Sequence, residues 1–221
     1  MNVSDAVRER RSVRGFLDKE VPLDVLKELA LTSARAATGG NIQPWHIDIV
    51  TGDKMAELKE IMRGKIERRE TETPGYDIYP REMNDATKAR TFQIGEIMYG
   101  HLGIPREDKR ARAQWFARNF QFFGAPAAFF VTVDRRMGPP QWADLGMYLQ
   151  NLMLLAVEKG LATCPQECWA VYPNTVESFL GTPPERMLFC GVAIGYEDAE
   201  ELANRTRSPR APEEEWLTVL A

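Results

Sequence analysis

Met187 to Gly195 read MLFCGVAIG, an apolar run that contains no charged residue. A run of this length is typical of a β-strand that is buried on both faces of a sheet. Ala127 to Val133 (AAFFVTV) is a second apolar run, and it also favours a strand. The sequence therefore predicts two strands, at least one of them deep inside the fold.

Outward from these runs, the pattern indicates one further strand and a series of helices. His46 to Val50 alternates between apolar and polar residues, which predicts a strand. Glu70 to Arg81 contains two prolines and a glycine without any period, so we expect it to be irregular. Three helices are predicted from their starting residues. The first covers Val3–Glu9 with Asn2 or Ser4 as the cap, the second runs from Pro22 to near Arg35, and the third runs from a cap at Asp53 towards Arg69. Further helices are predicted at Asp85–Gly100, Glu107–Phe123, Gln141–Lys159 and Thr175–Leu180.

The composition is that of an ordinary globular protein. Its 221 residues, 44% apolar and 27% charged, predict a single domain over residues 1–221 with a substantial core. With 28 basic and 32 acidic residues the formal charge is -4, so no overall field favours nucleic acid and any anion site must be local. We expect a cytoplasmic protein, because no apolar run could span a membrane and the first residues do not resemble a signal peptide.

Cysteine and histidine are too few for several kinds of site. Cys164, Cys168 and Cys190 are odd in number and form no disulfide framework. Neither histidine lies near them in sequence, which argues against a zinc site or a Cys-His nucleophile. We expect reduced cysteines packed as small apolar residues and, if the chain is an enzyme, a bound cofactor that carries the chemistry.

A basic cluster near the N-terminus is the first candidate site. Glu9 to Phe16 (ERRSVRGF) gathers Arg10, Arg11, Ser12 and Arg14 in an acidic protein. Guanidinium groups and a hydroxyl suit a phosphate, because they donate several charge-assisted hydrogen bonds to its oxygens. A solvated helix end explains the same residues, and the stretch alone favours that simpler interpretation.

Three other segments carry residues suited to a flat or anionic ligand. TGGNIQPW (38–45) combines two glycines, which permit close backbone approach, with two side-chain amides. ATCPQECW (162–169) follows the long helix, and NRTR (204–207) adds two arginines where the charged tail begins. Arg14 and Arg205 are 191 positions apart, so only the fold can bring them together.

Taken together, the four segments resemble the FMN-dependent nitroreductase family over nearly the whole chain. RRSVRGF is similar to the family's opening arginine-serine-basic motif, and GGNIQPWHI to its S-x-N-x-Q-P-W signature, the most specific match. ATCPQECW resembles the segment that passes the flavin ring, and NRTR the basic pair that returns to the phosphate. The four segments follow the family's order and spacing.

The resemblance implies an α+β fold with three layers, in which helices flank a mainly antiparallel central sheet. It also implies an intertwined homodimer with two FMN sites at the interface, each built from both chains. The tail cluster of Trp216, Leu217, Val219 and Leu220 could by itself dock on its own subunit or on a partner. The resemblance favours the partner, and it places the 38–45 loop opposite the other subunit's arginines.

The resemblance further assigns cofactor contacts to individual residues. Phosphate ligands are implied at Arg10, Arg11, Ser12, Arg205 and Arg207. Contacts from the other subunit are implied at Thr38, Gly39, Asn41 and Gln43. Contacts along the ring edge are implied at Pro165, Gln166 and Glu167, with the Glu167 backbone N–H reaching flavin N5. Arg14 is placed at the N1–C2 edge of the ring, where a fixed cation favours the reduced flavin.

The implied activity is ping-pong hydride transfer from NAD(P)H to flavin N5 and on to a nitroaromatic, quinone or similar acceptor. The cofactor carries this chemistry, so no catalytic side chain and no metal are expected. The resemblance implies that residues 62–123 shape the roof over the flavin. The aromatic candidates to line it are Tyr76, Tyr79, Phe92, Trp115, Phe120 and Phe123, although core packing is favoured for each of them. The alternatives are an FMN storage or sensor protein, and same-fold reductive dehalogenases or benzimidazole synthases with special lids.

Overall fold

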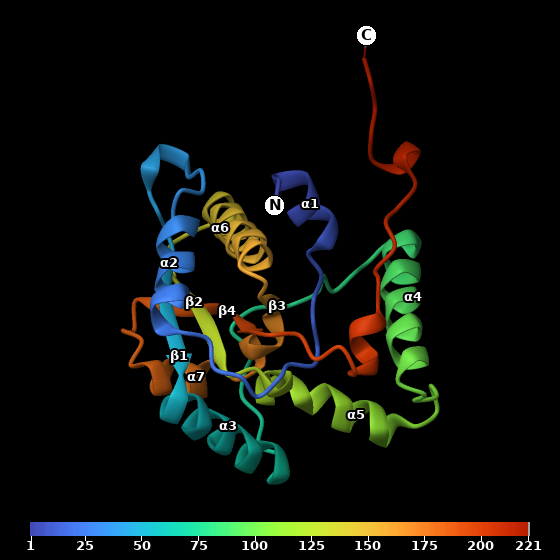
Figure 1. Ribbon diagram of the computed structural model, residues 1–221, viewed down its shortest axis with the longest axis horizontal. Coiled ribbons are helices and arrows are strands. Elements are labelled where there is room, and N and C mark those ends of the chain that lie inside the picture. Colours follow the sequence, from blue (N-terminus) through green and yellow to red (C-terminus); the bar gives the residue numbers. More distant parts are fainter. Residues whose placement is uncertain (221) are drawn as a thin grey trace.

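The computed structural model describes residues 1–220 and has a central sheet with helices on both faces (Figure 1). Within these residues the strands follow the order β1-β2-β4-β3, and every neighbouring pair is antiparallel. The expected α+β class with a mainly antiparallel sheet is confirmed. The strands are β1 (His46–Thr51), β2 (Ala127–Asp134), β3 (Ala162–Gln166) and β4 (Arg186–Gly195).

The two apolar runs of the sequence occupy the centre of the sheet. β2 and β4 pair from Ala127–Ile194 to Asp134–Arg186, with one irregularity beside Val131. Phe129 and Phe130 on β2 are fully buried, one on each face of the sheet. Burying such a side chain contributes roughly 1.5–3 kcal/mol, which explains why strands that are apolar on both faces lie between two helical layers.

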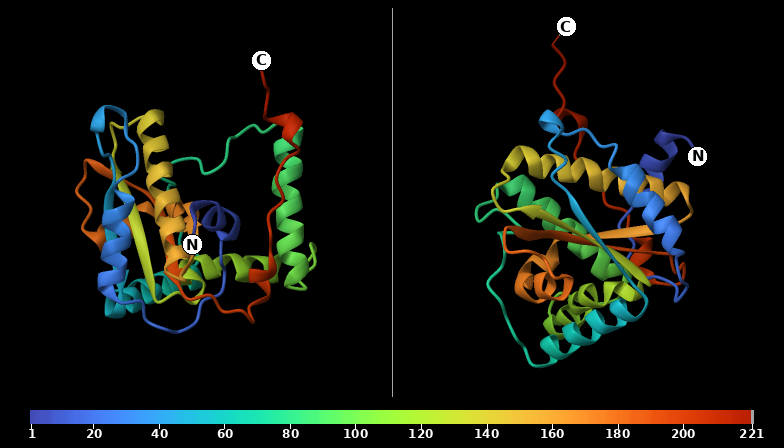
Figure 2. Two further views of the ribbon diagram at one scale, coloured as in Figure 1. Left: turned by 45° about the horizontal axis from the view of Figure 1, so that its top comes forward. Right: turned by 90° about the vertical axis from the view of Figure 1, so that its left-hand side faces the viewer.

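Each face of the sheet has its own core. On one face, α2 (Leu23–Ser33) and α6 (Pro139–Glu158) cover Phe129 with leucines such as Leu26 and Leu145. On the other face, α3 (Gly52–Glu67), α7 (Pro173–Leu180) and short 3-10 turns surround Phe130. The right-hand view of Figure 2 shows α6 on one side of the strands and α3 on the other.

Two helix predictions differ from the structure in detail. Asp53 is not the cap of α3, because the helix begins at Gly52 and Thr51 precedes it as the cap residue. The predicted helix Glu107–Phe123 is α-helical only as α5 (Lys109–Ala117) and continues as the 3-10 turn η2 (Arg118–Gly124). Phe122 and Phe123 have positive φ there. Both are buried in the core in a backbone conformation that a right-handed helix does not contain.

Strand β3 was not predicted from the sequence, which offered only a segment after the long helix. Its five residues include Pro165, and proline normally argues against a strand because it cannot donate a ladder hydrogen bond. β3 lies at the edge of the sheet, paired with β4 on one side, where a proline is tolerated. The segment 162–166 thereby becomes part of the rigid sheet.

Two helices and the tail lie outside the layered core. α1 (Val3–Glu9) begins at Asn2, whose side chain accepts the Asp5 backbone N–H at 2.9 Å. α4 (Asp85–His101) has no buried residue among those described and stands apart from the sheet, beside the chain's last segment (Figure 1). No helix within residues 1–220 combines the length and apolarity that crossing a membrane requires.

Candidate functional site

The N-terminal arginine segment, residues 10–16, is attached to the end of the sheet by its backbone. The Val13 N–H donates to the Thr163 carbonyl at 2.9 Å, and Ser12 forms a parallel bridge with the same residue of β3. The Phe16 N–H donates to the Phe123 carbonyl at 3.3 Å. The arginines are therefore carried on a backbone that the sheet and the η2 turn hold in place.

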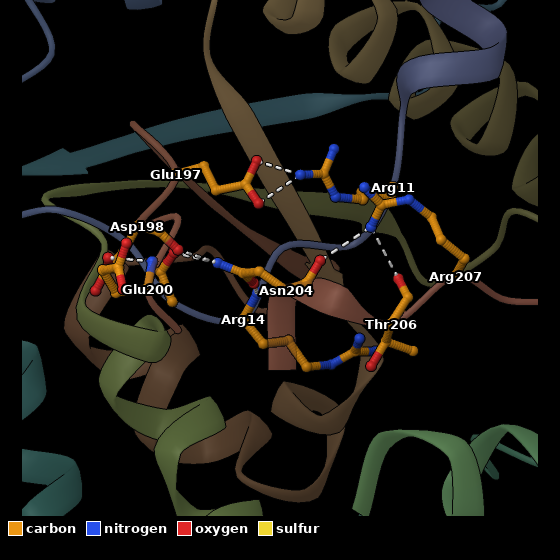
Figure 3. Close-up of polar contacts among 9 residues, drawn as sticks. Arg11, Arg14, Glu197, Asp198, Glu200, Asn204, Thr206 and Arg207 are labelled. Carbon is orange, nitrogen blue, oxygen red and sulfur yellow. Dashed lines mark hydrogen bonds and ion pairs between the residues drawn. The ribbon is translucent and has the colours of Figure 1, made fainter. Parts of the chain in front are cut away.

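A buried asparagine joins this segment to the chain's last part. The Asn204 Oδ1 accepts the Arg14 backbone N–H at 2.7 Å, while its Nδ2 donates to the carbonyls of Gly15 at 2.9 Å and Asp198 at 2.8 Å. Figure 3 shows this junction, with the Arg14 side chain running past Asn204 towards Thr206. The backbone that carries Arg205 and Arg207 is thereby held beside the N-terminal arginine segment.

The arginines at this junction lack acidic partners. Within residues 1–220, no carboxylate oxygen lies within 4 Å of the guanidinium groups of Arg10, Arg14, Arg205 or Arg207. Burial, and then the positive charge of Arg210, lower the pKa of the half-buried Arg10. The Thr206 hydroxyl is buried beside them and has no hydrogen-bond partner among the described residues. Several cations and a spare hydroxyl suit a doubly charged anion such as a phosphate monoester.

Arg11 differs from its neighbours, because its guanidinium forms an ion pair with Glu197 across the end of the sheet. Both side chains are about three-quarters buried. The guanidinium is therefore already engaged by a carboxylate of its own chain, which a phosphate would have to displace. The ion pair favours a role for Arg11 in attaching the arginine segment to the exit of β4, although its buried Nε has no hydrogen-bond partner among the described residues. The expected contact of Arg11 with a phosphate stays a prediction.

The 38–43 loop is shaped by local contacts and is open to solvent. Gly40, Asn41 and Gln43 all have positive φ, and Gly39 to Gln43 are exposed. The Gln43 N–H donates to the Thr38 hydroxyl at 3.0 Å. One contact reaches the core, from the Gly39 N–H to the buried Asp144 carboxylate of α6 at 3.3 Å. The side chain of Asn41 faces outward without a partner among the described residues.

The loop and the arginine segment lie near opposite ends of α6. Gly39 contacts Asp144 in the second turn of the helix, whereas Ser12 bridges Thr163, just beyond its C-terminus. From Asp144 to Glu158 the helix rises by roughly 20 Å, at about 1.5 Å per residue. The left-hand view of Figure 2 shows this separation. Within one chain, the fold does not bring the two predicted sets of ligands together.

The 165–167 segment follows β3 and presents its three residues differently. Gln166 is buried, and its amide nitrogen donates to the Asn119 carbonyl at 2.8 Å while its oxygen accepts the Trp169 indole N–H at 3.3 Å. The Gln166 side chain therefore positions the segment from inside the core and is not free to contact a ligand. Pro165 is half-buried and Glu167 is exposed.

Trp169 anchors the 165–167 segment to the core. It is fully buried and lies between Phe120, Phe122 and Phe130, with ring centroids 5.3, 4.7 and 5.3 Å away. Gly191 makes room for it, because a Cβ at that position would lie 2.6 Å from the indole Cδ1. The turn from Glu167 to Val171 is thus fixed by packing, and it holds the residues before it at the end of β3.

The cysteines near this segment are reduced and protonated at neutral pH. Cys164 and Cys190 are buried and Cys168 is half-buried. Burial raises the pKa of the Cys164 thiol to about 11, and burial also raises the pKa of Cys168, helped by Cys164 and Glu167. A thiol with such a raised pKa is a poor nucleophile, which agrees with the expected role as small apolar residues.

The aromatic residues considered for a roof divide into two groups. Trp115, Phe120 and Phe123 are buried in the core. Tyr76 packs against Trp142 and Phe189 and donates its hydroxyl hydrogen to the Phe189 carbonyl. The exposed candidates are Tyr79 and Phe92, with 66% and 50% of their surface accessible.

Some residues that organise the site were missed by sequence reasoning. The sequence pattern assigns no role to Asn204 beyond its place in NRTR, and none to Glu197. Glu197 pairs with Arg11, and Asn204 contacts Arg14 and Gly15, all more than 180 positions away, so no local pattern indicates these contacts. Gly15 offered one signal, because a glycine directly after Arg14 indicates a close approach of two backbones.

Comparison with known proteins shows which family the sequence and the fold match. The model of the nitroreductase family matches residues 7–196. A 4-nitrobenzoate reductase of Nocardioides sp. (strain LMS-CY) is 34% identical over 221 residues, which cover 97% of this chain and 88% of that protein.

Solved structures extend the similarity to the whole fold. The FMN and NADPH-dependent nitroreductase NfnB of Sphigopyxis sp. strain HMH superposes with a TM-score of 0.96 at 43% identity, and all of both chains is covered. The FMN-dependent nitroreductase NfnB of Mycobacterium smegmatis, solved in complex with NADPH, superposes with a TM-score of 0.92 at 27% identity, again over the full length of both chains.

Proposed function

The chain belongs to the nitroreductase family, and from this premise we propose that it is an FMN-dependent NAD(P)H oxidoreductase acting on nitroaromatic compounds, quinones or similar acceptors. One observation carries the proposal for this chain. Arginines from both ends of the sequence meet at Asn204 without acidic partners, beside a buried hydroxyl that also lacks one. A phosphate monoester supplies the charge and the acceptor oxygens that this arrangement requires.

The residues of this junction would hold the cofactor by its phosphate. Arg10, Ser12, Arg205 and Arg207 are the proposed ligands, and Arg207 already donates to the Asn204 carbonyl at 2.9 Å, which limits its movement. A dianion among them would offset the repulsion between Arg10 and Arg210. Arg11 belongs to the support of this site through Glu197.

The remaining groups would orient the flavin ring. When bound, FMN supplies the chemistry, accepting hydride from NAD(P)H and passing it to the aromatic acceptor in a ping-pong cycle. Asn204 holds the backbone of Arg14, whose guanidinium would lie at the ring edge of bound FMN and would favour the reduced cofactor. Pro165 and the Glu167 backbone N–H are the proposed ring-edge contacts, and they rest on the buried Gln166 and Trp169.

A homodimer completes the proposed site. Thr38, Gly39, Asn41 and Gln43 lie too far along α6 from the arginines of their own chain, so a second subunit would present its loop instead. Apolar side chains are exposed on the surfaces that such a dimer would cover. They include Val3 and Val7 of α1, Met147 of α6, and Trp216, Val219 and Leu220 of the tail. Exposed apolar residues in this number favour a protein interface.

The mass in solution tests the dimer. The parent is expected to sediment as a dimer. A variant that ends at Ala211 lacks the apolar tail, so its dimer is expected to dissociate at a higher protein concentration than that of the parent. A parent that stays monomeric at all concentrations while still binding FMN would remove the two-chain site from the proposal.

The absorption spectrum tests the activity. The protein, purified without added cofactor, is expected to show a flavin spectrum that NADPH or NADH bleaches in the absence of oxygen. Adding a nitroaromatic or a quinone should restore it. Flavin that stays oxidised with either nicotinamide would point to a storage or sensor protein. A colourless protein that takes up no FMN would contradict the proposed function.

A further inference from the structure

We propose that Asn204 is a positioning residue for the phosphate site, which sets the N-terminal arginine segment and the C-terminal arginines at the spacing that one phosphate can bridge. The proposal rests on the proposed function, because it concerns the FMN phosphate. Asn204 would not touch the cofactor. Its effect would pass through the backbone of residues 10–15 and of residues 205–207.

The contacts of Asn204 account for this role. The residue is 4% exposed, and its side chain makes three hydrogen bonds, all of them to backbone groups. One partner is the Arg14 N–H, and the other two are the carbonyls of Gly15 and Asp198. Removing a buried amide that makes these hydrogen bonds is costly, because each former partner is left as a buried polar group with no hydrogen bond to protein or to water.

Only an amide side chain matches these three partners. Accepting from Arg14 requires an oxygen, and donating to two carbonyls requires an NH2 group, which an asparagine supplies from one short side chain. An aspartate would keep the acceptor but turn a carboxylate oxygen towards the carbonyls of Gly15 and Asp198. An alanine would leave all three backbone groups unpaired in a buried place.

Gly15 allows the two segments to approach closely enough for this amide to reach. A Cβ at position 15 would meet the Cβ and Cγ of Glu201 and lie 3.3 Å from the Asn204 Nδ2. The carbonyl of Gly15 also accepts the Asp198 N–H at 3.0 Å, so the amide of Asn204 and the backbone of Asp198 share one acceptor. The contact between Gly15, Asp198 and Asn204 therefore sets the spacing between residues 10–15 and residues 205–207.

The consequence is specific to the phosphate end of the cofactor. Loss of Asn204 would release Arg205 and Arg207 from Arg14, whereas Trp169 and Gln166 would still hold the 165–167 segment through their own contacts. Affinity for the phosphate should fall while affinity for the ring stays. A general loss of structure would weaken both.

The experiment compares FMN with riboflavin, which has the same ring but no phosphate. Dissociation constants of both flavins are measured by fluorescence for the parent, Asn204→Ala and Asn204→Asp. We expect Asn204→Ala to bind FMN about tenfold or more weakly, as for the loss of a charge-assisted contact, and riboflavin within about twofold of the parent. Asn84→Ala is the control, because Asn84 caps α4 by accepting the Thr87 N–H at 2.8 Å, away from the junction.

One result would overturn the proposal, namely an Asn204→Ala protein that keeps the parent's preference for FMN over riboflavin. If only Asn204→Asp then lost that preference, the cause would be repulsion between a carboxylate and the phosphate. A parent that binds neither flavin would instead contradict the proposed function itself, so the two failures are distinguishable.

Hydrogen exchange of the parent covers the case in which the variants do not fold. The Arg14 amide is expected to exchange as slowly as the Val13 amide, which donates to the Thr163 carbonyl, and to slow further when FMN is added but not when riboflavin is added. An Arg14 amide that exchanges like the exposed Gly40 amide would show that Asn204 does not hold it, and the proposal would be wrong.

Discussion

The arginine segment 10–16 and the 38–43 loop are both proposed to contact one cofactor, yet they differ in how firmly the rest of the chain holds them. The first is fastened to β3, to η2 and to Asn204 by hydrogen bonds from its backbone. The second is exposed, and the Gly39 N–H ties it to α6 by a hydrogen bond to Asp144. A segment that recognises a charge requires fixed donors, whereas a loop that contributes to an interface is completed by the surface that it meets.

The two regions also differ in their glycines. Gly15 lies where a side chain would strike Glu201, while a Cβ on Gly39 would meet nothing within 4 Å. The first glycine is required by packing inside one chain. The second leaves space open, and that space is available to a ligand or to another subunit.

The largest expected effect is that of Gly15→Ala. The added methyl group collides with Glu201, so we expect a loss of about 3 kcal/mol in the free energy of unfolding, at the upper end for an overpacked site. Gly39→Ala should change it by less than about 0.5 kcal/mol. Urea unfolding of the flavin-free proteins measures both. Equal free energies of unfolding for the two variants would show that packing does not distinguish Gly15 from Gly39.

The next effect is that of Arg10→Ala on cofactor binding. Arg10 is half-buried without a carboxylate partner within residues 1–220. The Arg10→Ala protein would therefore lose a charge-assisted contact to the FMN phosphate, and FMN binding should weaken by about 2 kcal/mol. Arg8→Ala is the matched control, because Arg8 is exposed and pairs with Asp5. FMN dissociation constants at fixed salt decide the matter. The assignment of Arg10 fails if both variants bind FMN as the parent does.

A smaller effect separates Arg11 from its neighbours. Arg11→Met breaks the ion pair with Glu197, and we expect a loss of about 1 kcal/mol of stability, since the pair is only partly exposed. The preference for FMN over riboflavin should stay, because this guanidinium is not a proposed phosphate ligand. Glu197→Gln should behave in the same way. A Met variant that loses the FMN preference while Glu197→Gln keeps it would restore Arg11 as a ligand.

The smallest effect is expected in the loop. Asn41→Gly keeps the positive φ of that position and removes an exposed amide, so the stability of the flavin-free protein should not change measurably. FMN binding should weaken by about 0.5–1 kcal/mol, the scale of one neutral hydrogen bond. Titration with FMN measures the change. A clear loss of stability without any loss of binding would give the loop a purely structural role.

Sequence reasoning worked best where the signal is local. The apolar run of β4 and the periodicity of α6 lie within single windows, and both elements end within two residues of their predicted bounds. It failed at β3, where a proline obscured an edge strand, and at Phe122 and Phe123, where packing of the core imposes a positive φ on aromatic residues. Packing between distant parts of the chain overrides local preference in these places.

The sequence by itself determined the central strands, the main helices and the four segments that indicate an FMN-dependent nitroreductase, because each depends on neighbouring residues. Only the tertiary structure decided that Asn204 joins Arg14 to the tail, that Glu197 engages Arg11, and that Gln166 turns into the core. The first two join groups more than 180 positions apart, and the third depends on Asn119 from another element. Such partners become neighbours only after the chain has folded.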